Sequence, residues 1–464
     1  MCQPPSPTAV REKLGTSVPE EITVEKVQPV LNLRPQRIYR VDLSDGTRLH
    51  LVTPPYSKWR PLRSDQGMVL SETIAVRWIK ERAAASFFPS SPSPSSSSPS
   101  AKQEKEPTEN EGKEEEKEDE GGDPDETNFW YTFYAPTPGA PLLSLLAPAS
   151  QQGAARNLDR ATINSQLGKL HGRLASFTSP TGRFGPVAAT IPPPIGTTTP
   201  PPSSSGPSFH RQQQQHLGAA GGLFGTVGAA SWSVAFHSML EGSLRDGEDM
   251  AVVLSYPTIR RHYRRLGYLL DEVRVPRLVV VDGGDESNVL VEGVPVEEEE
   301  EKKEWKVRGL RDWSSCVFGD PLLGVAFSDP GLEPGAQPAQ AFLDGFNGEG
   351  KNTTNAPLSY PLNLNPSLIE GVETAWVRLL LYQVFHAVAR IVAEFYRPRA
   401  DSGARELEAR RRLNIVLAKL AEVPDDVKGG GARKKHARPS GEMSPAKRLR
   451  ALPAPEGSSF SSSS

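Results

Sequence analysis

The sequence is poor in cysteine, with only Cys2 and Cys316 among its 464 residues. Two cysteines in unlike surroundings exclude a disulfide framework and a cysteine-rich metal cluster, and they favour an intracellular protein. The first residues lack the apolar run that a signal peptide needs, so we do not expect secretion. Hydrophobic residues make up only 37% of the chain, beside 44 prolines and 40 glycines. A sizeable part of the chain therefore cannot belong to a core, and we expect one globular unit interrupted by insertions.

Long apolar runs are also scarce, and the most apolar one covers residues 375–396. It carries Arg378, His386, Arg390 and Glu394, and placing these polar side chains in a lone membrane span would cost considerable free energy. The sequence therefore predicts a buried helix here and no membrane partner.

Four segments have almost nothing to bury. They are a flexible N-terminus (1–23), an acidic and Ser/Pro-rich insertion (85–127), a second insertion (190–229) and a basic, Ser-rich tail (425–464). We expect the two insertions and the tail to be disordered.

The tail has 8 basic and 2 acidic residues between positions 428 and 464. Its clusters 433–435 and 447–450 are arranged as in a bipartite nuclear localisation signal, so the expected location is intracellular, either nuclear or cytoplasmic. The alternative is a solvated basic tail that is not a localisation signal. Because the tail has no interleaved aromatic residues, nothing here supports nucleic-acid binding.

The ordered remainder mixes strand and helix patterns. Alternating residues on both sides of "SDG" predict a hairpin over 36–53, and helical periodicity marks 67–82, 160–177 and 375–396. An aromatic strand is expected at 128–134. Two further apolar runs, 277–281 and 289–293, predict a pair of strands.

Between this last pair of strands lies the loop "DGGDESN", which offers Asp282 and Asn288, and Asp312 follows in "GLRDW". Carboxylate and amide oxygens are the ligands that Mg²⁺ takes, and an aspartate can orient a hydroxyl for phosphoryl transfer. The competing interpretation is a plain turn, since Asp, Gly, Ser and Asn are what tight connections use. The motifs "RDW" and "FGDPLL", which follow in the expected order, favour the phosphoryl-transfer site over the plain turn.

The segments "RLVVVDGGDESNVLV" and "VRGLRDWSSCVFGDPLL" together resemble the catalytic segment of the aminoglycoside phosphotransferase-like family, especially its divergent fungal members. The resemblance implies that Asp282 is the catalytic aspartate, that Asn288 and Asp312 bind metal, and that Asp320 is structural. ATP and Mg²⁺ are the implied cofactors.

The same resemblance implies an α+β, two-lobed protein-kinase-like fold. Its small β-rich N-lobe would cover 24–135 and its mostly helical C-lobe 136–424, with an acidic hairpin extension at 292–304. Glu72 resembles the glutamate of the N-lobe helix. Tyr134 and Ala135 resemble the segment that borders an adenine, so these three are expected to bind nucleotide.

The sequence departs from the family in ways that bear on activity. Val280 stands where the family's loop has histidine, and Asp282 precedes Asn288 by six residues where the family pattern has five. Leu51 stands where a strand lysine would hold the nucleotide phosphates, with His50 beside it, and no glycine-rich phosphate loop precedes it.

Two functions follow as hypotheses. The first is ATP- and Mg²⁺-dependent transfer of a phosphoryl group to a hydroxyl of an unknown small molecule. The alternative is a pseudokinase, a binding or scaffolding module that keeps the fold without efficient catalysis. Protein partners cannot be read from the sequence. His171 and His386 lie on largely apolar helical faces, and we expect them to be core residues without chemistry.

Overall fold

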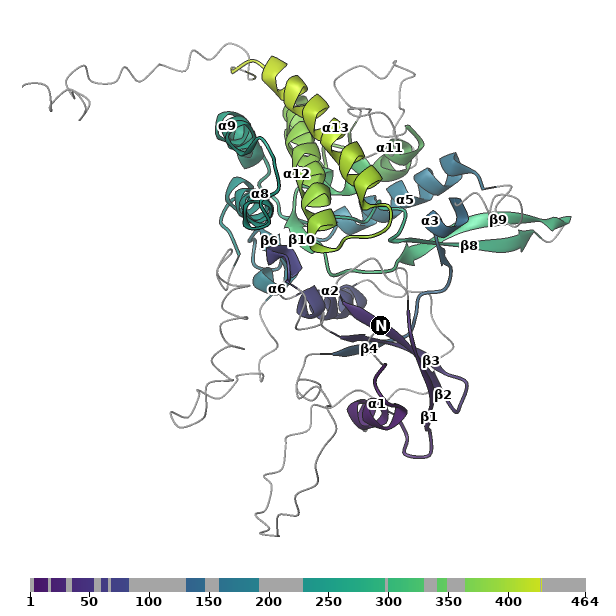
Figure 1. The fold of residues 1–464 in the computed structure, drawn as a ribbon. Coiled ribbons are helices and arrows are strands. Elements are labelled where there is room, and N and C mark those ends of the chain that lie inside the picture. Colours follow the sequence, from purple (N-terminus) through teal and green to yellow (C-terminus); the bar gives the residue numbers. More distant parts are fainter. Residues whose placement is uncertain are drawn as a thin grey trace, which may run out of the picture. The chain divides into compact units, whose positions relative to one another are not determined.

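The computed structural model describes residues 4–15, 18–30, 36–53, 60–65, 68–82, 131–146, 158–191, 228–296, 299–328, 340–348, 364–425 and 427 (Figure 1). The predicted insertion 85–127, most of the insertion 190–229 and nearly all of the tail lie outside these residues. The same holds for the basic clusters 433–435 and 447–450, so the nuclear address stays a prediction.

The N-terminal part forms a four-stranded antiparallel sheet in the order β1-β2-β3-β4. Its strands are β1 (Val24–Pro29), β2 (Arg37–Leu43), β3 (Arg48–Thr53) and β4 (Thr132–Tyr134). The hairpin expected at 36–53 is confirmed, because Arg37 pairs with Thr53 and Asp42 with Arg48. Gly46 takes a φ of 81° in the connecting turn, a conformation that glycine adopts without steric cost.

A short helix, α1 (Pro7–Leu14), lies against β1 (Figure 1). Its Val10 and Leu14 pack in one apolar cluster with Tyr39, Val41 and Leu51. The sheet face that carries Leu51 is thus filled by α1 and its neighbours. Residues 63–65 form a 3-10 turn, η2 (Arg63–Asp65), before the helix α2 (Met68–Arg82).

Helices make up most of the remainder. They are α3 (Leu142–Leu146), α5 (Arg160–Ala175), α6 (Val187–Thr190), α8 (Trp232–Asp249), α9 (Tyr256–Leu266), α10 (Val325–Ser328), α11 (Gln340–Asn347), α12 (Ala375–Tyr396) and α13 (Ser402–Glu422). Three 3-10 turns in the described residues lie beside these helices: η3 (Gly267–Glu272) follows α9, η4 (Pro321–Leu323) precedes α10, and η5 (Val372–Thr374) precedes α12.

Two small sheets lie among these helices. One has the order β6-β10-β7, with β6 (Gly185–Pro186), β10 (Cys316–Gly319) and β7 (Arg277–Val280). The other has the order β5-β8-β9, with β5 (Ala140–Pro141), β8 (Val289–Val296) and β9 (Glu299–Leu310). The acidic extension expected at 292–304 falls in the antiparallel β8–β9 hairpin. The described chain is therefore a mixture of helices and sheets, as predicted.

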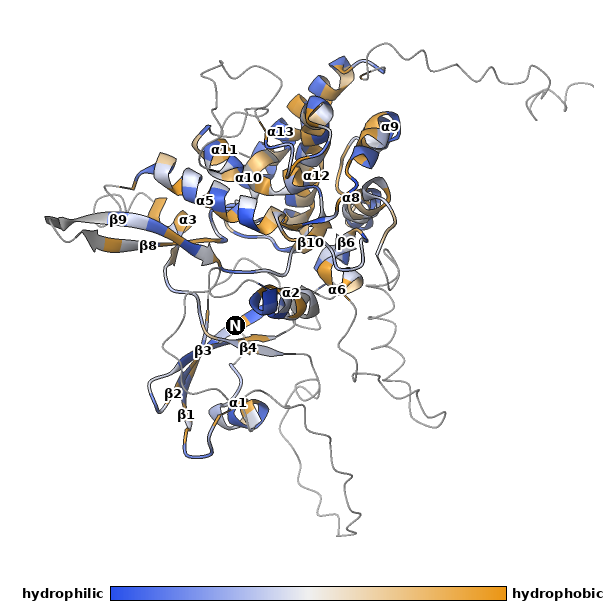
Figure 2. Cartoon of the chain, turned by 180° about the vertical axis from the view of Figure 1, so that it is seen from behind, coloured by the Kyte–Doolittle hydropathy of each residue, from blue (hydrophilic) through white to orange (hydrophobic). Residues whose placement is uncertain are grey.

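Helix α12 is the central apolar element of the core. Hydrophobic residues dominate it and β10 (Figure 2). The segment Val372–Tyr396 is long and apolar enough to cross a membrane, yet 78% of its most apolar window is buried against the protein. Charged Arg378 and Glu394 are buried with it. The expectation of a buried helix at 375–396 is confirmed.

Helices α5 and α11 approach each other so closely that glycine is required at their contact. A Cβ on Gly168 would lie 2.1 Å from the Phe342 carbonyl oxygen, and one on Gly345 would lie 2.0 Å from that of Ser165. Because backbone atoms cannot give way cheaply, Gly168→Ala is expected to lower the free energy of unfolding by about 1 to 3 kcal/mol or more. Urea unfolding measures the loss.

The matched control for this substitution is Gly403→Ala in the first turn of α13, where an added Cβ meets nothing within 4 Å. Helix propensity predicts that this change leaves stability unchanged or raises it slightly. Equal stability of the Gly168→Ala variant and the parent would show that the two helices do not meet as described.

Candidate functional site

The loop between β7 and β8 is built from successive turns. The Gly283 N–H donates to the Val280 carbonyl at 3.0 Å, the Asp285 N–H to the Asp282 carbonyl at 3.0 Å, and the Asn288 N–H to the Asp285 carbonyl at 2.8 Å. Asp285 also accepts from the Ser287 N–H and hydroxyl, at 2.9 and 2.6 Å. These turns use the residue types that favour tight connections, and they fix where Asp282 and Asn288 lie.

Asn288 joins the loop to the segment that follows β9. Its Nδ2 donates to the Asp312 carbonyl at 3.2 Å and reaches the Asp282 Oδ1 at 3.3 Å. Its Oδ1 accepts from the Asp312 N–H at 2.9 Å. With only 1% of its surface exposed, Asn288 lies where an unpaired amide would be costly. The structure thus brings Asp282, Asn288 and Asp312 together.

Ser315 holds the Asp282 carboxylate, a contact that the sequence motif did not indicate. The Ser315 hydroxyl donates to the Asp282 Oδ1 at 2.5 Å, and Asp282 is half-buried. A charge-assisted hydrogen bond of this kind is short and strong. Ser315 directly precedes β10, and the pairing of β10 with β7 brings it beside the loop.

Asp312 is 4% exposed, and its Oδ1 accepts from the Ser314 N–H at 2.6 Å. Magnesium is held in phosphotransfer sites by one or two protein oxygens together with phosphates and water. The donor set fits that demand, because Asp312 is a carboxylate and the carbonyl of Asn288 has a second lone pair beyond the one used by the Asp312 N–H. No cluster of three or more histidine, cysteine or acidic residues suited to a metal occurs within the described ranges.

His171 of α5 lies directly under the same loop. A Cβ on Gly283 would come within 3.0 Å of the His171 ring, so the loop backbone and the imidazole are in tight contact. Burial lowers the pKa of His171 to about 4, and a hydrogen bond with the Gly283 backbone opposes that shift. His171 is therefore neutral near pH 7. A neutral histidine from α5 thus packs against the backbone of this loop.

Three contacts attach the acidic side of the loop to the helices. Arg390 of α12 lies 3.7 Å from Asp285, and Arg160 of α5 lies 2.7 Å from Glu286. The Leu143 N–H of α3 donates to the Glu286 carbonyl at 2.9 Å. Both ion pairs are partly exposed, so each adds at most about 1 kcal/mol, and the backbone contact is the more specific of the three.

The residues expected to bind nucleotide lie on other elements. Glu72 is on α2 and is 5% exposed. Tyr134 ends β4 and its ring meets that of His50 edge-on, with centroids 5.5 Å apart. Ala135 follows β4 directly and is exposed. Their role as nucleotide ligands stays a prediction.

Asp320 lies in the core, apart from the loop. It caps η4 by accepting from the Leu322 N–H at 3.1 Å, and it accepts from the Tyr382 hydroxyl at 2.8 Å. Arg378 lies 3.0 Å from its second oxygen. Burial, and then the charge of Asp320, raise the pKa of Tyr382 well above its usual value. All these contacts organise the packing of η4 against α12.

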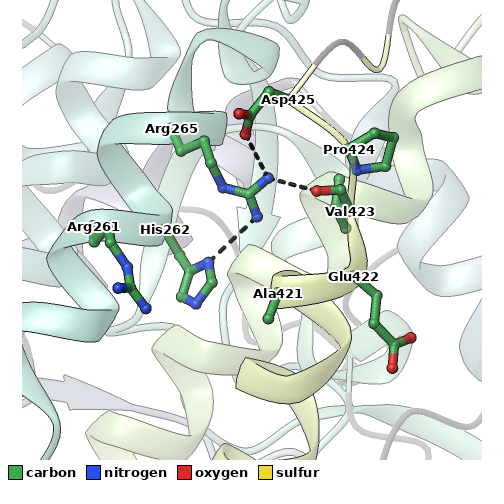
Figure 3. A pocket seen from close by; sticks show the side chains of 8 residues that line it. All are labelled: Arg261, His262, Arg265, Ala421, Glu422, Val423, Pro424 and Asp425. Atoms are coloured by element: carbon green, nitrogen blue, oxygen red, sulfur yellow. Dashed lines mark hydrogen bonds and ion pairs between the residues drawn. The ribbon is translucent and has the colours of Figure 1, made fainter.

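A cavity of about 440 Å³ occurs at the end of α13, beside α9 (Figure 3). It is lined by Arg261, His262, Arg265, Ala421, Glu422, Val423, Pro424 and Asp425. Arg265 donates to the Val423 carbonyl at 2.5 Å, to the Leu420 carbonyl and to the Asp425 carboxylate. Its charge thus caps the carbonyl end of α13, and this cavity contains none of the predicted site residues.

Comparisons with known proteins give only distant likenesses. No protein-family model and no curated protein matches the chain. A mutant aminoglycoside 2'-phosphotransferase-IIIa in complex with GDP has a TM-score of 0.41 and 11% identity over 90% of this chain and 99% of that one. A macrolide 2'-phosphotransferase type I has a TM-score of 0.35 and 13% identity over 91% and 100%. Likenesses at this level identify neither a family nor a ligand, and the fungal-type resemblance stays a prediction.

Proposed function

We propose that the chain has a two-lobed, protein-kinase-like fold of the aminoglycoside phosphotransferase type. It transfers the γ-phosphoryl group of ATP to a hydroxyl of a small molecule. The observation that carries this proposal is the hydrogen-bonded convergence of Asp282, Asn288 and Asp312, which come from two loops 24 residues apart. A simple turn needs no such link to a second acidic loop.

In this proposal Asp282 orients the acceptor hydroxyl and takes up its proton as the phosphoryl group leaves ATP. Ser315 and Asn288 both donate to the Oδ1 of this carboxylate and so hold its orientation. Asp312 and Asn288 would hold Mg²⁺, which neutralises phosphate charge when bound. A carboxylate whose orientation is fixed in advance needs little reorganisation during the reaction.

The pseudokinase is the second candidate, and one observation favours it. Leu51 is fully buried in the cluster with Val10 and Leu14, so the position expected to carry a phosphate-binding lysine faces the core. A protein that lacks this cation could still bind nucleotide, but it would not transfer the phosphoryl group efficiently. Nucleotide binding and transfer must therefore be measured separately.

Thermal unfolding with and without Mg²⁺ and ATP tests the proposal through Asp312→Asn. The parent is expected to melt at a higher temperature with both ligands present, since a ligand that binds only the folded state stabilises it. The Asp312→Asn variant keeps an acceptor for the Ser314 N–H. Its melting temperature without ligands should match the parent's, while the ligand-dependent rise should be lost.

Three outcomes separate the candidates. A ligand-dependent rise together with ADP formation supports the phosphotransferase. A rise without ADP formation, across a panel of small hydroxyl compounds, supports the pseudokinase. A parent whose melting temperature does not change with ATP and Mg²⁺ would overturn the phosphotransferase and leave a scaffolding module that binds no nucleotide.

A further inference from the structure

Two serine hydroxyls contact aspartates of the loop between β7 and β8, and the two contacts are built differently. The Ser287 hydroxyl donates to the Asp285 Oδ1 at 2.6 Å, only two residues away, and the other oxygen of Asp285 lies 3.7 Å from Arg390. A serine hydroxyl commonly bonds within its own turn in this way. The Ser315 hydroxyl donates to the Asp282 Oδ1 at 2.5 Å across 33 residues of chain. Turn chemistry does not account for this second contact.

The contact of Ser315 with Asp282 has the geometry of a hydroxyl on its general base. A base must lie within hydrogen-bond reach of the proton that it takes, and an ionised carboxylate only accepts, so the shared proton belongs to Ser315 and points at Asp282. Within the described residues no group donates to the Ser315 Oγ, so its lone pairs are open to form a new bond. Part of the Ser315 surface is exposed.

The same hydroxyl lies beside the candidate metal ligands. The Asn288 Nδ2 reaches the Asp282 Oδ1, which Ser315 also contacts, at 3.3 Å, and it donates to the Asp312 carbonyl at 3.2 Å. Asp312 precedes Ser315 by three residues, and its Oδ1 accepts from the Ser314 N–H at 2.6 Å. The base, the candidate metal ligands and the serine hydroxyl therefore form one hydrogen-bonded group.

We propose that Ser315 is itself a phosphoryl acceptor, which the chain phosphorylates in cis when it binds ATP with Mg²⁺. This inference rests on the proposed function and adds an acceptor that belongs to the chain. Asp282 takes the hydroxyl proton while the Ser315 Oγ forms its bond to the γ-phosphorus. The bond from that phosphorus to the bridging oxygen breaks, ADP leaves with the electron pair, and Asp282 passes its proton to water. The product is a phosphoserine at position 315.

The test is incubation of the full chain with ATP and Mg²⁺, followed by mass spectrometry of its peptides. Peptide mapping is needed because the tail is also rich in serine. The parent should gain phosphate at Ser315, and the Ser315→Ala variant should gain none in that peptide. Asp282→Asn keeps an oxygen that accepts from Ser315 but cannot act as the base, so phosphorylation of Ser315 should slow about 10²- to 10⁴-fold.

Ser287→Ala provides the matched control, because it removes the other serine hydroxyl that is hydrogen-bonded to an aspartate of this loop. Phosphate should still appear at Ser315 at the rate of the parent. Transfer within one chain also makes the rate constant independent of protein dilution. An Asp282→Asn chain that is mixed with the parent and ATP should therefore stay unmodified at Ser315.

Each remaining outcome is decisive. If the parent phosphorylates small hydroxyl compounds while Ser315 stays unmodified, the role of Ser315 is refuted and the proposed function stands. If the parent phosphorylates the Asp282→Asn chain at Ser315, transfer occurs between chains and the reaction in cis is refuted. If the parent forms no ADP, with or without hydroxyl compounds, and gains no phosphate, this inference fails together with the proposed function.

Discussion

Asp282→Ala is expected to reduce phosphoryl transfer about 10²- to 10⁴-fold, the range that a positioned general base contributes. Ser315 and Asn288 hold this carboxylate, so alanine removes the group that they orient. The contacts of Asn288 with Asp312 persist, and nucleotide binding should remain close to that of the parent. ADP release, measured with a panel of small hydroxyl compounds, reports the loss.

Glu286→Ala is the control for this experiment. Glu286 lies in the same loop, and its carboxylate contacts Arg160 at a partly exposed site. Its backbone carbonyl, which receives the Leu143 N–H, is unaffected by the substitution. Turnover should stay within about twofold of the parent. An Asp282→Ala variant that turns over as fast as Glu286→Ala would exclude Asp282 from the chemistry.

Arg378→Met is expected to give the largest loss of stability, about 3 to 5 kcal/mol. Arg378 is fully buried, lies 3.0 Å from Asp320 and 3.5 Å from Glu272, and donates to the Glu370 carbonyl at 2.5 Å. Methionine fills a similar volume, but it leaves the Asp320 carboxylate buried without its positive partner. The loss should appear as a lower urea midpoint.

Arg412→Met on α13 is the comparison for Arg378→Met. Arg412 pairs with Glu408 one turn earlier, 2.9 Å away and partly exposed. Pairs of this kind contribute about 0.3 to 0.5 kcal/mol, so the midpoint should scarcely move. If the two variants are equally stable, the buried ion pairs around Asp320 do not support the core.

The sequence predicted the elements well wherever a periodic pattern was strong. The 36–53 hairpin, the helices α2, α5 and α12, and the strands β7 and β8, which lie in different sheets, all follow from the alternation or spacing of apolar residues. Such patterns depend on neighbours a few positions apart, which the chain itself displays. The two insertions expected from composition lie mostly outside the described residues, so they stay predictions.

Only part of the candidate site could be predicted from the sequence. Side-chain chemistry pointed to Asp282, Asn288 and Asp312, because oxygen donors in a turn-rich loop are visible in the sequence. His171 was expected in the core, where the structure has it, but its contact with the loop at Gly283 was not predicted, nor was the hydrogen bond from Ser315 to Asp282. Helix packing and the pairing of β10 with β7 produce these contacts, and neither leaves a local signal in the sequence.

Residue types and their local spacing indicated which side chains suit chemistry and which segments are expected to contribute nothing to a core. The packing of distant segments then made Leu51 face an apolar cluster, His50 face Tyr134, and Asn288 a buried link between two acidic loops. Composition and periodicity are local, whereas burial and hydrogen-bond partners depend on which distant segments are packed together.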